Sequence, residues 1–238
     1  MPVDECFTRR RHRYKLDIGG DRPNGANRGE RMKLYFMPGT CALAIHIVLE
    51  WTGERYEDEE VERGMLQSPA YLALNPSGVV PTLVDGDRVL VEASAILLHL
   101  ADTHPRHELI PPVGLPERYD AYRWVVYVGG TLHPHFWPYF APGRYTTNPA
   151  HEADVRTAAE ALIGKDFDVI DRQLAGRRFI LGDRKSIADA YLFPMARWGY
   201  RLKRPTAAYA NIHRFVETMA ADPGVRAAMV RHRIGAPA

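Results

Sequence analysis

The chain has 238 residues and a formal net charge of +2, with 46% hydrophobic and 25% charged residues. This composition is that of a globular protein and excludes disordered and fibrous classes. No run of about 18 apolar residues occurs, so we expect no membrane association through a spanning helix. The two cysteines, Cys6 and Cys41, cannot form a disulfide framework. Their small number favours a reducing, cytoplasmic location.

The first 31 residues differ from the rest in charge. They hold eight Lys or Arg against five Asp or Glu, which leaves a net charge of −1 for residues 32–238. Because they lack apolar periodicity, we expect residues 1–31 to be a disordered basic leader, dispensable and upstream of a start at Met32. The alternatives are a targeting role and binding to an acidic surface or nucleic acid. The near-neutral body predicts no nucleic-acid partner.

Residues 32–112 show the pattern of a compact α/β domain. Strands are expected at 33–36, 55–61, 81–84 and 89–91, and helices at 41–52, 68–74 and 93–102. In the first helix Cys41, Ala44, Ile45 and Val48 define the inward face, so His46 and Glu50 are expected on the other face. Gly53 stands where a residue that ends this helix is expected. The order β-α-β-α-β-β-α fits one α/β layer structure.

Strand signals stop after Pro112, and residues 113–238 are expected to form an all-helical domain. Helices are predicted at 116–140, 149–174, 187–202 and 208–221. Ser186 and Asp189 have the spacing of a capping box. In the second of these helices the predicted inward stripe consists of Val155, Ala159, Leu162, Ile163 and Ile170.

Cys41 is the first candidate for chemistry, because it stands at the first turn of a helix directly after a strand. Unpaired amide groups and the helix dipole at such a place lower the pKa of a thiol, which predicts a reactive thiolate. The alternative is a small buried hydrophobe in register with Ala44 and Ile45. Thr40 is expected to be the N-cap and to donate a hydrogen bond to a bound sulfur.

Two further places fit a small peptide-like ligand. A cis Val80-Pro81 bond would turn the main chain of Val80 toward an extended ligand, whereas a trans proline opening an edge strand is the alternative. The amides of Ala93 and Ser94 start a helix and favour an anion, while Glu92 can accept from an ammonium group. Alternatively, Glu92 only complements the helix dipole.

These three sites, in this order within one β-α-β-α-β-β-α unit, resemble the thioredoxin-fold half of the glutathione transferases. The resemblance extends over residues 32–230, and the stretch Met32–Cys41 looks most like the bacterial beta class. Residues 75–83 are similar to the family's approach to its cis-proline. Residues 179–190 match its capping box and hydrophobic staple.

The resemblance implies a thioredoxin-like glutathione-binding domain over 32–112, an all-helical substrate domain over 113–238, and a site built from both. It implies glutathione as co-substrate, a small hydrophobic electrophile, a role in detoxification, and a homodimer marked by an apolar patch. The carried-over roles are sulfur contact or covalent bonding for Cys41, a nearby histidine in His133, and glutathione binding by Val80, Pro81, Glu92, Ala93 and Ser94.

The chain departs from the family pattern at three places. Ala93 replaces the usual serine, which removes a hydroxyl hydrogen bond of about 1 kcal/mol. Pro134 stands where the beta class has a lysine. Three residues are missing before Asn75, in the region that often binds the glycine carboxylate, and Arg63 is a candidate substitute.

Residues 133–143 combine prolines with aromatic residues. Pro134 and Pro138 are expected to bend or end their helix. The aromatic side chains predict an apolar pocket for the second substrate, formed by Phe136, Trp137 and Phe140, or alternatively a packed domain interface. His133 and His135 suggest no third ligand, so no metal site is expected.

Two reactions fit this site: addition of the glutathione thiolate to an electrophile, and disulfide exchange through a Cys41–glutathione mixed disulfide. Some proteins of this fold, such as the stringent starvation protein, bind partners without catalysis, and that is one alternative. A glutathione-dependent isomerase or dehalogenase is the other.

Overall fold

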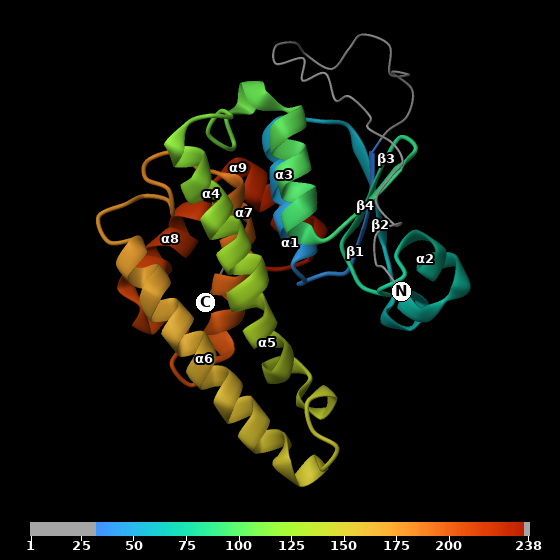
Figure 1. Cartoon of the computed structure of the whole chain (residues 1–238), viewed down its shortest axis with the longest axis vertical. Coiled ribbons are helices and arrows are strands. Elements are labelled where there is room, and N and C mark those ends of the chain that lie inside the picture. Colours follow the sequence, from blue (N-terminus) through green and yellow to red (C-terminus); the bar gives the residue numbers. More distant parts are fainter. Residues whose placement is uncertain (1–31, 236–238) are drawn as a thin grey trace, which may run out of the picture.

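The computed structural model describes residues 32–235, so the expectations for residues 1–31 and for Cys6 lie outside the described residues. A four-stranded sheet forms the α/β half, with strand order β2-β1-β3-β4 (Figure 1). Its strands are β1 (Met32–Phe36), β2 (Tyr56–Glu60), β3 (Thr82–Asp85) and β4 (Arg88–Val91). β1 and β2 are parallel, and the other pairs are antiparallel. The predicted strands are confirmed to within two residues.

The helices of this half lie on both sides of the sheet. α1 (Ala42–Thr52) and α3 (Ala93–Thr103) face the helical half, and the short α2 (Pro69–Leu74) lies on the far side (Figure 1). α1 packs against α3, α7 and α9, so every residue from Ala42 to Leu49 is buried. The expectation that His46 lies on an outer face is therefore wrong, because other helices also cover the face of α1 that carries His46. Gly53 ends the helix with a left-handed φ of 68°, as predicted.

The C-terminal half is entirely helical within the described residues. It contains α4 (Pro116–Tyr127), α5 (His133–Phe140), α6 (Glu152–Gln173), α7 (Ile187–Trp198), α8 (Ala210–Ala220) and α9 (Pro223–Arg231). Of these, α9 was not expected. Its signal was present in the sequence, because Asp222 caps the amides of Gly224 and Val225 and Pro223 takes the first helical position.

The prolines of α5 do not end the helix. α5 continues through Pro138 to Phe140, and the irregularity lies earlier, in a π-helical segment over Val128–Leu132. A π segment changes the local hydrogen-bonding pattern to i→i+5, which accommodates a following proline that has no N–H to donate.

The predicted stripe on α6 is largely correct. Ala159, Ile163 and Ile170 are buried and Val155 is half-buried, but Leu162 is exposed. Neighbouring residues on a helix point about 100° apart, so Leu162 cannot share the inward direction of Ile163. No helix of residues 32–235 is long and apolar enough to cross a membrane.

The capping box at the start of α7 is confirmed and extends further than expected. The buried carboxylate of Asp189 accepts hydrogen bonds from the Ser186 amide (2.8 Å), the Ser186 hydroxyl (2.7 Å) and the Ile180 amide (2.8 Å). Asp189 therefore joins the loop before α7 to the helix itself. Burial raises the pKa of Asp189 to about 6 against the effect of these donors.

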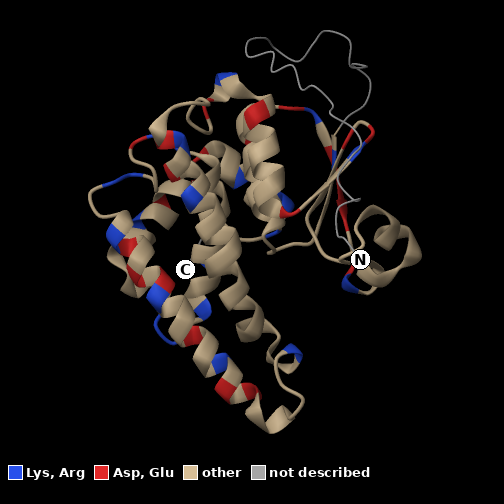
Figure 2. Ribbon diagram, in the orientation of Figure 1, with Lys and Arg blue, Asp and Glu red and all other residues tan. Residues whose placement is uncertain are grey.

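Two arginines near residue 232 form ion pairs with β2, the edge strand of the sheet. β2 carries four consecutive acidic residues, which appear as a red strand in Figure 2. Arg231 pairs with Asp58 (2.8 Å) and Arg233 with Glu60 (2.7 Å). These pairs place the C-terminal segment beside the turn that follows β1.

Candidate functional site

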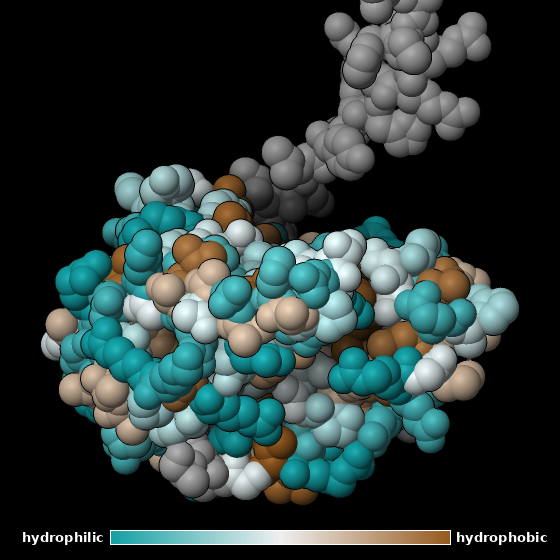
Figure 3. Space-filling model, turned by 90° about the horizontal axis from the view of Figure 1, so that it is seen from below, coloured by the Kyte–Doolittle hydropathy of each residue, from teal (hydrophilic) through white to brown (hydrophobic). Residues whose placement is uncertain are grey.

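A pocket of about 740 Å³ lies between the two halves of the molecule. Its walls are the turn before α1, the loop before β3, and residues of α5 and α7. Figure 3, seen from below, shows apolar residues recessed in a hollow bordered by hydrophilic ones. The residues that line the pocket include Cys41, Val80, His133, Phe136, Trp137 and Phe140, which are the predicted thiol, main-chain and aromatic positions.

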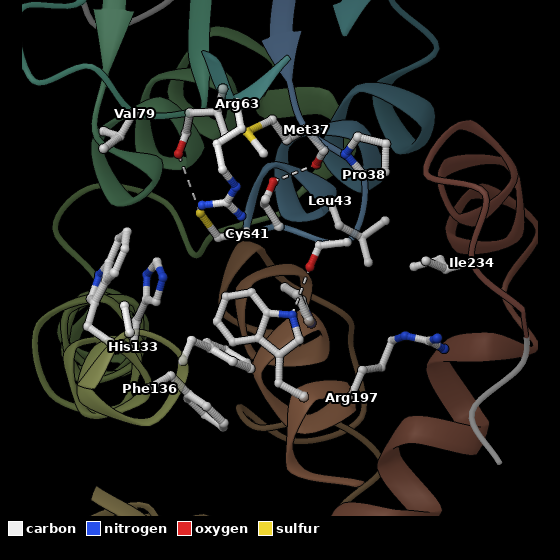
Figure 4. A pocket seen from close by; sticks show the side chains of 18 of the residues that line it. Met37, Pro38, Cys41, Leu43, Arg63, Val79, His133, Phe136, Arg197 and Ile234 are labelled. Atoms are coloured by element: carbon white, nitrogen blue, oxygen red, sulfur yellow. Dashed lines mark hydrogen bonds between the residues drawn. The ribbon is translucent and has the colours of Figure 1, made fainter. Parts of the chain in front are cut away.

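Cys41 is the N-cap residue of α1 and only 6% exposed. Its thiol donates a weak hydrogen bond to the Val80 carbonyl oxygen, with 3.8 Å between Sγ and O (Figure 4). Burial, with a smaller contribution from the Glu92 charge, raises the pKa of the thiol to about 12. The expected lowering of this pKa is therefore wrong. In the free protein Cys41 is a neutral thiol and a hydrogen-bond donor.

Thr40 does not have the role that its position suggested. Its hydroxyl donates to the Met37 carbonyl (2.7 Å) and accepts weakly from the Ala42 amide (3.4 Å). The hydroxyl proton is used inside the turn, so it is not free for a bound sulfur. The turn is thus stabilised by Thr40, and the pocket is left to Cys41.

The turn before Cys41 is held from the other half of the molecule. The Gly39 amide donates to Nδ1 of His232 (3.1 Å), and the Gly39 carbonyl accepts from the indole N–H of Trp198 (2.9 Å; Figure 4). Gly39 has a φ of +73°, a conformation that favours glycine. His232 and Trp198 therefore position the thiol turn, and no local sequence pattern points to either residue.

A chain of buried hydrogen bonds continues from Gly39 to the sheet. Since Nδ1 of His232 accepts from Gly39, neutral His232 carries its proton on Nε2 and donates to Nδ1 of His46 (2.9 Å). Nε2 of His46 then donates to Asp58 (3.2 Å). Burial lowers the pKa of His46 to about 4 and that of His232 to about 3, so both rings are neutral at pH 7.

The hydrogen bonds through His232 and His46 predict that the protein loses stability in mild acid. The unfolded chain protonates both histidines below pH about 6.5, whereas the folded protein resists protonation down to about pH 4. Each histidine therefore lowers the free energy of unfolding by about 1.4 kcal/mol per pH unit as the pH falls through this range. Asp189, with its raised pKa, contributes with the opposite sign. Urea unfolding at several pH values measures the slope.

His232→Gln is the matched variant for that measurement, because glutamine keeps polar atoms but does not titrate. The variant should show a slope that is smaller by about one proton between pH 6 and 4. Equal slopes in the two proteins would contradict the assignment of neutral His232 to the folded state.

His133 lies in the pocket wall, and Figure 4 shows its ring on the side toward Cys41. Its Nδ1 forms a hydrogen bond of 3.1 Å with the Tyr191 hydroxyl, which also interacts with the Ser94 side chain. Burial lowers the pKa of His133 to about 4, so the imidazole is neutral. Tyr191, from α7, is a buried partner of His133 that the sequence analysis did not identify.

The start of α3 lies beside the pocket and not in its lining. Glu92 is exposed with a φ of 68°, and its charge acts on both Cys41 and Tyr191. Ser94 faces Tyr191 and Gly129, where its hydroxyl is engaged by the helical half. Ala93 is buried. Pro81 also lies outside the lining, and the Val80-Pro81 bond is cis, which confirms that alternative over trans.

The aromatic wall of the pocket comes from α5 and α7. Phe136 is buried and stacks with Phe140 at a ring distance of 5.7 Å, while Trp137 and Phe140 are partly exposed. Trp198 packs edge-on against both Phe136 and Phe140. Phe136 therefore packs in the core and also lines the pocket, together with Trp137 and Phe140, while binding of a second substrate by these residues stays a prediction.

No metal site is found among the residues that the structure describes. His135, which the sequence places beside His133, instead pairs with Asp166 at 2.6 Å. Asp166 also accepts from the Tyr127 hydroxyl (3.0 Å), so it links α4 and α5 to α6.

A small parallel-antiparallel sheet with a cis-proline, a cysteine at the first helix start and a following all-helical half defines the glutathione transferase fold. Two family models match the chain: "Glutathione S-transferase, N-terminal domain" over residues 30–102 and "Glutathione S-transferase, C-terminal domain" over residues 130–223. The chain belongs to the glutathione S-transferase family, and it is an enzyme.

Individual relatives agree with this membership. The chain is 37% identical over 203 residues to glutathione S-transferase GST-4.5 of Xanthomonas campestris, covering 83% of this chain and 97% of the relative. The solved glutathione S-transferase of Xylella fastidiosa aligns with a TM-score of 0.81 at 33% identity, covering 86% and 100%.

Two further solved structures bear on the class. A sphingomonad glutathione S-transferase complexed with glutathione aligns with a TM-score of 0.76 at 33% identity. The bacterial beta class glutathione S-transferase of Sphingomonas chungbukensis aligns with a TM-score of 0.76 at 31% identity. Both alignments cover 85% of this chain and 100% of the other. The resemblance to the bacterial beta class is confirmed.

Proposed function

We propose that this enzyme binds glutathione in the pocket and transfers it to a small hydrophobic electrophile. The observation that carries the proposal is the 3.8 Å contact between the Cys41 thiol and the Val80 carbonyl inside the 740 Å³ pocket. In this arrangement the Cys41 thiol can donate to the sulfur of a peptide ligand, and the Val80 main chain can bind the backbone of the same ligand. In this proposal residues 32–112 bind glutathione and residues 113–238 bind the second substrate.

The main chain of Val80 is available to pair with the cysteinyl residue of glutathione. The ladder between β1 and β3 ends at the pair Tyr35–Thr82, so Val80 and Pro81 precede it. An extended peptide can therefore bind there by β-type hydrogen bonds without displacing a strand.

Groups of complementary charge are available for the two ends of glutathione. Glu92 accepts from the ammonium of the γ-glutamyl end, and the amides of Ala93 and Ser94, at the start of α3, bind its carboxylate. The glycine carboxylate is assigned to Arg63, which lines the pocket from the α/β half (Figure 4). Ser94 binds through its amide alone, because its hydroxyl is engaged by Tyr191.

The protonation of Cys41 favours conjugation over disulfide exchange as the main reaction. A thiol with a raised pKa keeps its proton, so Cys41 is a poor nucleophile but has an S–H group with which to stabilise the glutathione thiolate by a hydrogen bond. The glutathione thiol first loses its proton to solvent. The resulting thiolate then forms the carbon–sulfur bond, and the leaving group departs with the electron pair of the bond that breaks. His133, held by Tyr191 as a neutral ring, borders the reacting sulfur from the helical half.

Calorimetric titration with glutathione tests this proposal. We expect saturable binding of one glutathione per subunit and turnover of 1-chloro-2,4-dinitrobenzene in its presence. S-methylglutathione, which cannot form a thiolate, should bind and remain unreacted. Absence of both binding heat and turnover would contradict the proposed function.

We further propose that the protein is a cytoplasmic homodimer that serves detoxification. The support for a dimer is an exposed apolar stripe along α4, formed by Tyr119, Tyr122 and Val126. Such residues one and two turns apart on a helix form a continuous face that favours association. A site with a reduced cysteine fits a reducing compartment.

Val126→Glu should shift the protein from dimer to monomer in sedimentation velocity, because it places a charge in the apolar stripe of α4. Val126 is 59% exposed in the single chain, so the monomer should fold. Val230→Glu is the matched control, since Val230 is 75% exposed but lies on α9. The same sedimentation coefficient for both variants and the unaltered protein would exclude this face.

A further inference from the structure

The pocket wall carries an unusual set of charges for a site that binds hydrophobic electrophiles. Four arginines line it, Arg63, Arg144, Arg197 and Arg201, and the lining contains no Asp or Glu. None of the four forms an ion pair with a carboxylate of residues 32–235. Arginines elsewhere do: Arg118, Arg231 and Arg233 each pair with an acidic residue.

Two of the four arginines already have other tasks. Arg63 belongs to the α/β half and is assigned above to the glycine carboxylate of glutathione. Arg197 donates to the Gly235 carbonyl (2.9 Å) and lies over the Phe193 ring, so it holds the segment that follows α9. Figure 4 shows it directed toward Ile234 and away from Cys41.

Arg144 and Arg201 remain, and both belong to the helical half. Their side chains are exposed, and each sits beside the aromatic wall. The Arg144 guanidinium lies 5.1 Å from the centre of the Trp137 ring, and the main chain of Arg201 accepts from the Tyr139 hydroxyl (2.8 Å). Among the acidic residues of the helical half, Glu160 pairs with Lys203 and Glu152 lies against Gly143, and neither is part of the pocket lining.

An apolar wall beside two arginines that pair with no carboxylate of the described residues is complementary to an aromatic acid. Unpaired positive charge in a hollow with apolar walls raises the local concentration of anions. The planar guanidinium also matches a carboxylate with two parallel hydrogen bonds. A neutral electrophile would use only the Trp137 and Phe140 surfaces, and the two arginines would stay solvated.

We infer that the second substrate is an aromatic electrophile that carries a carboxylate. Its ring lies on Trp137 and Phe140, and its carboxylate is bound by Arg144 and Arg201. This inference rests on the proposed function and specifies its acceptor. With an aryl chloride the glutathione sulfur bonds to the ring carbon, the carbon–chlorine bond breaks, and chloride leaves with the electron pair.

A matched pair of probes tests the inference: 4-chloro-3-nitrobenzoate and its neutral amide, 4-chloro-3-nitrobenzamide. The kcat/KM for each is divided by its uncatalysed rate with glutathione, which removes the difference in intrinsic reactivity. We expect this ratio to favour the acid by about tenfold at low salt and to decline as salt screens the arginines. Equal ratios, or a preference for the amide, would overturn the inference.

Substitutions then locate the anion site. Arg144→Gln and Arg201→Gln should each reduce the preference for the acid about threefold, and the double variant should abolish it. Arg226→Gln, an exposed arginine on α9 outside the pocket, should keep the preference. A preference that survives in the double variant would place the anion elsewhere and overturn the inference.

A binding measurement separates the two levels of the argument. The glutathione conjugates of the two probes are titrated calorimetrically, so no turnover is needed. Tighter binding of the acidic conjugate, lost in the double variant, supports the inference even if catalysis is slow. Equal binding of both conjugates overturns the inference but leaves the glutathione site intact. If glutathione itself does not bind, the proposed function fails and the inference fails with it.

Discussion

Asp189→Ala is expected to lower the free energy of unfolding by about 3–5 kcal/mol, because it removes the acceptor of three buried donors. The amides of Ile180 and Ser186 and the Ser186 hydroxyl would be left without a partner inside the core of the helical half. Such a loss is a large part of the stability of an ordinary domain. Equilibrium unfolding in urea measures it.

Two milder variants show whether the effect belongs to the network. Asp189→Asn keeps one acceptor oxygen and should cost less than the alanine change. Ser186→Ala removes only the hydroxyl and should cost about 1 kcal/mol. A loss below about 1 kcal/mol for Asp189→Ala would contradict a central role for this carboxylate.

Cys41→Ala is expected to lower kcat/KM for conjugation about tenfold or more, because the glutathione thiolate loses the S–H donor proposed for it. The same change should abolish the mixed disulfide between residue 41 and oxidised glutathione, which peptide mapping distinguishes from one at Cys6. Steady-state kinetics with 1-chloro-2,4-dinitrobenzene and mass spectrometry of the protein measure the two effects separately.

Cys41→Ser decides between a donor and a nucleophile. A hydroxyl can donate a hydrogen bond to a thiolate, but it cannot form a disulfide. Conjugation should therefore recover most of its rate in the serine variant while disulfide formation stays absent. If the serine variant is as slow as the alanine variant, Cys41 acts through its sulfur and the donor role is wrong.

Features that depend on neighbouring residues could be predicted from the sequence. The strands, most helices, the capping box and the Gly53 terminus all depend on patterns within a few residues, and the structure confirms them. The aromatic stretch of α5 was also placed correctly at the pocket, as were Cys41 and Val80. Their roles in binding and catalysis stay predictions.

The electrostatic state of Cys41 depends on distant parts of the chain and could not be predicted in the same way. Its position at a helix start predicts a lowered pKa, but burial under residues of both halves dominates and raises it. The prediction for the orientation of His46 was wrong for a related reason. A helix with neighbours on several sides has no outer face there, so apolar periodicity does not report its orientation.

The residues that hydrogen-bond to the turn before Cys41 could not be predicted from local sequence patterns. His232 and Trp198 are 193 and 159 positions away from Gly39 in the chain, and neither belongs to a motif with it. Tyr191 reaches the site from α7, 58 positions after its partner His133. Only the packing of the helical half against α1 brings these side chains together.

Because both polar groups of Gly39 are satisfied by the helical half, the α/β half cannot supply a finished thiol site by itself. A fragment that ends before α4 would keep the sequence of the sheet and the cysteine, yet its turn would have lost two of its anchors. Trimming the chain before His232 would have a similar, smaller consequence. If the helical half of this enzyme is exchanged for another, the new half therefore has to contain residues equivalent to Trp198 and His232.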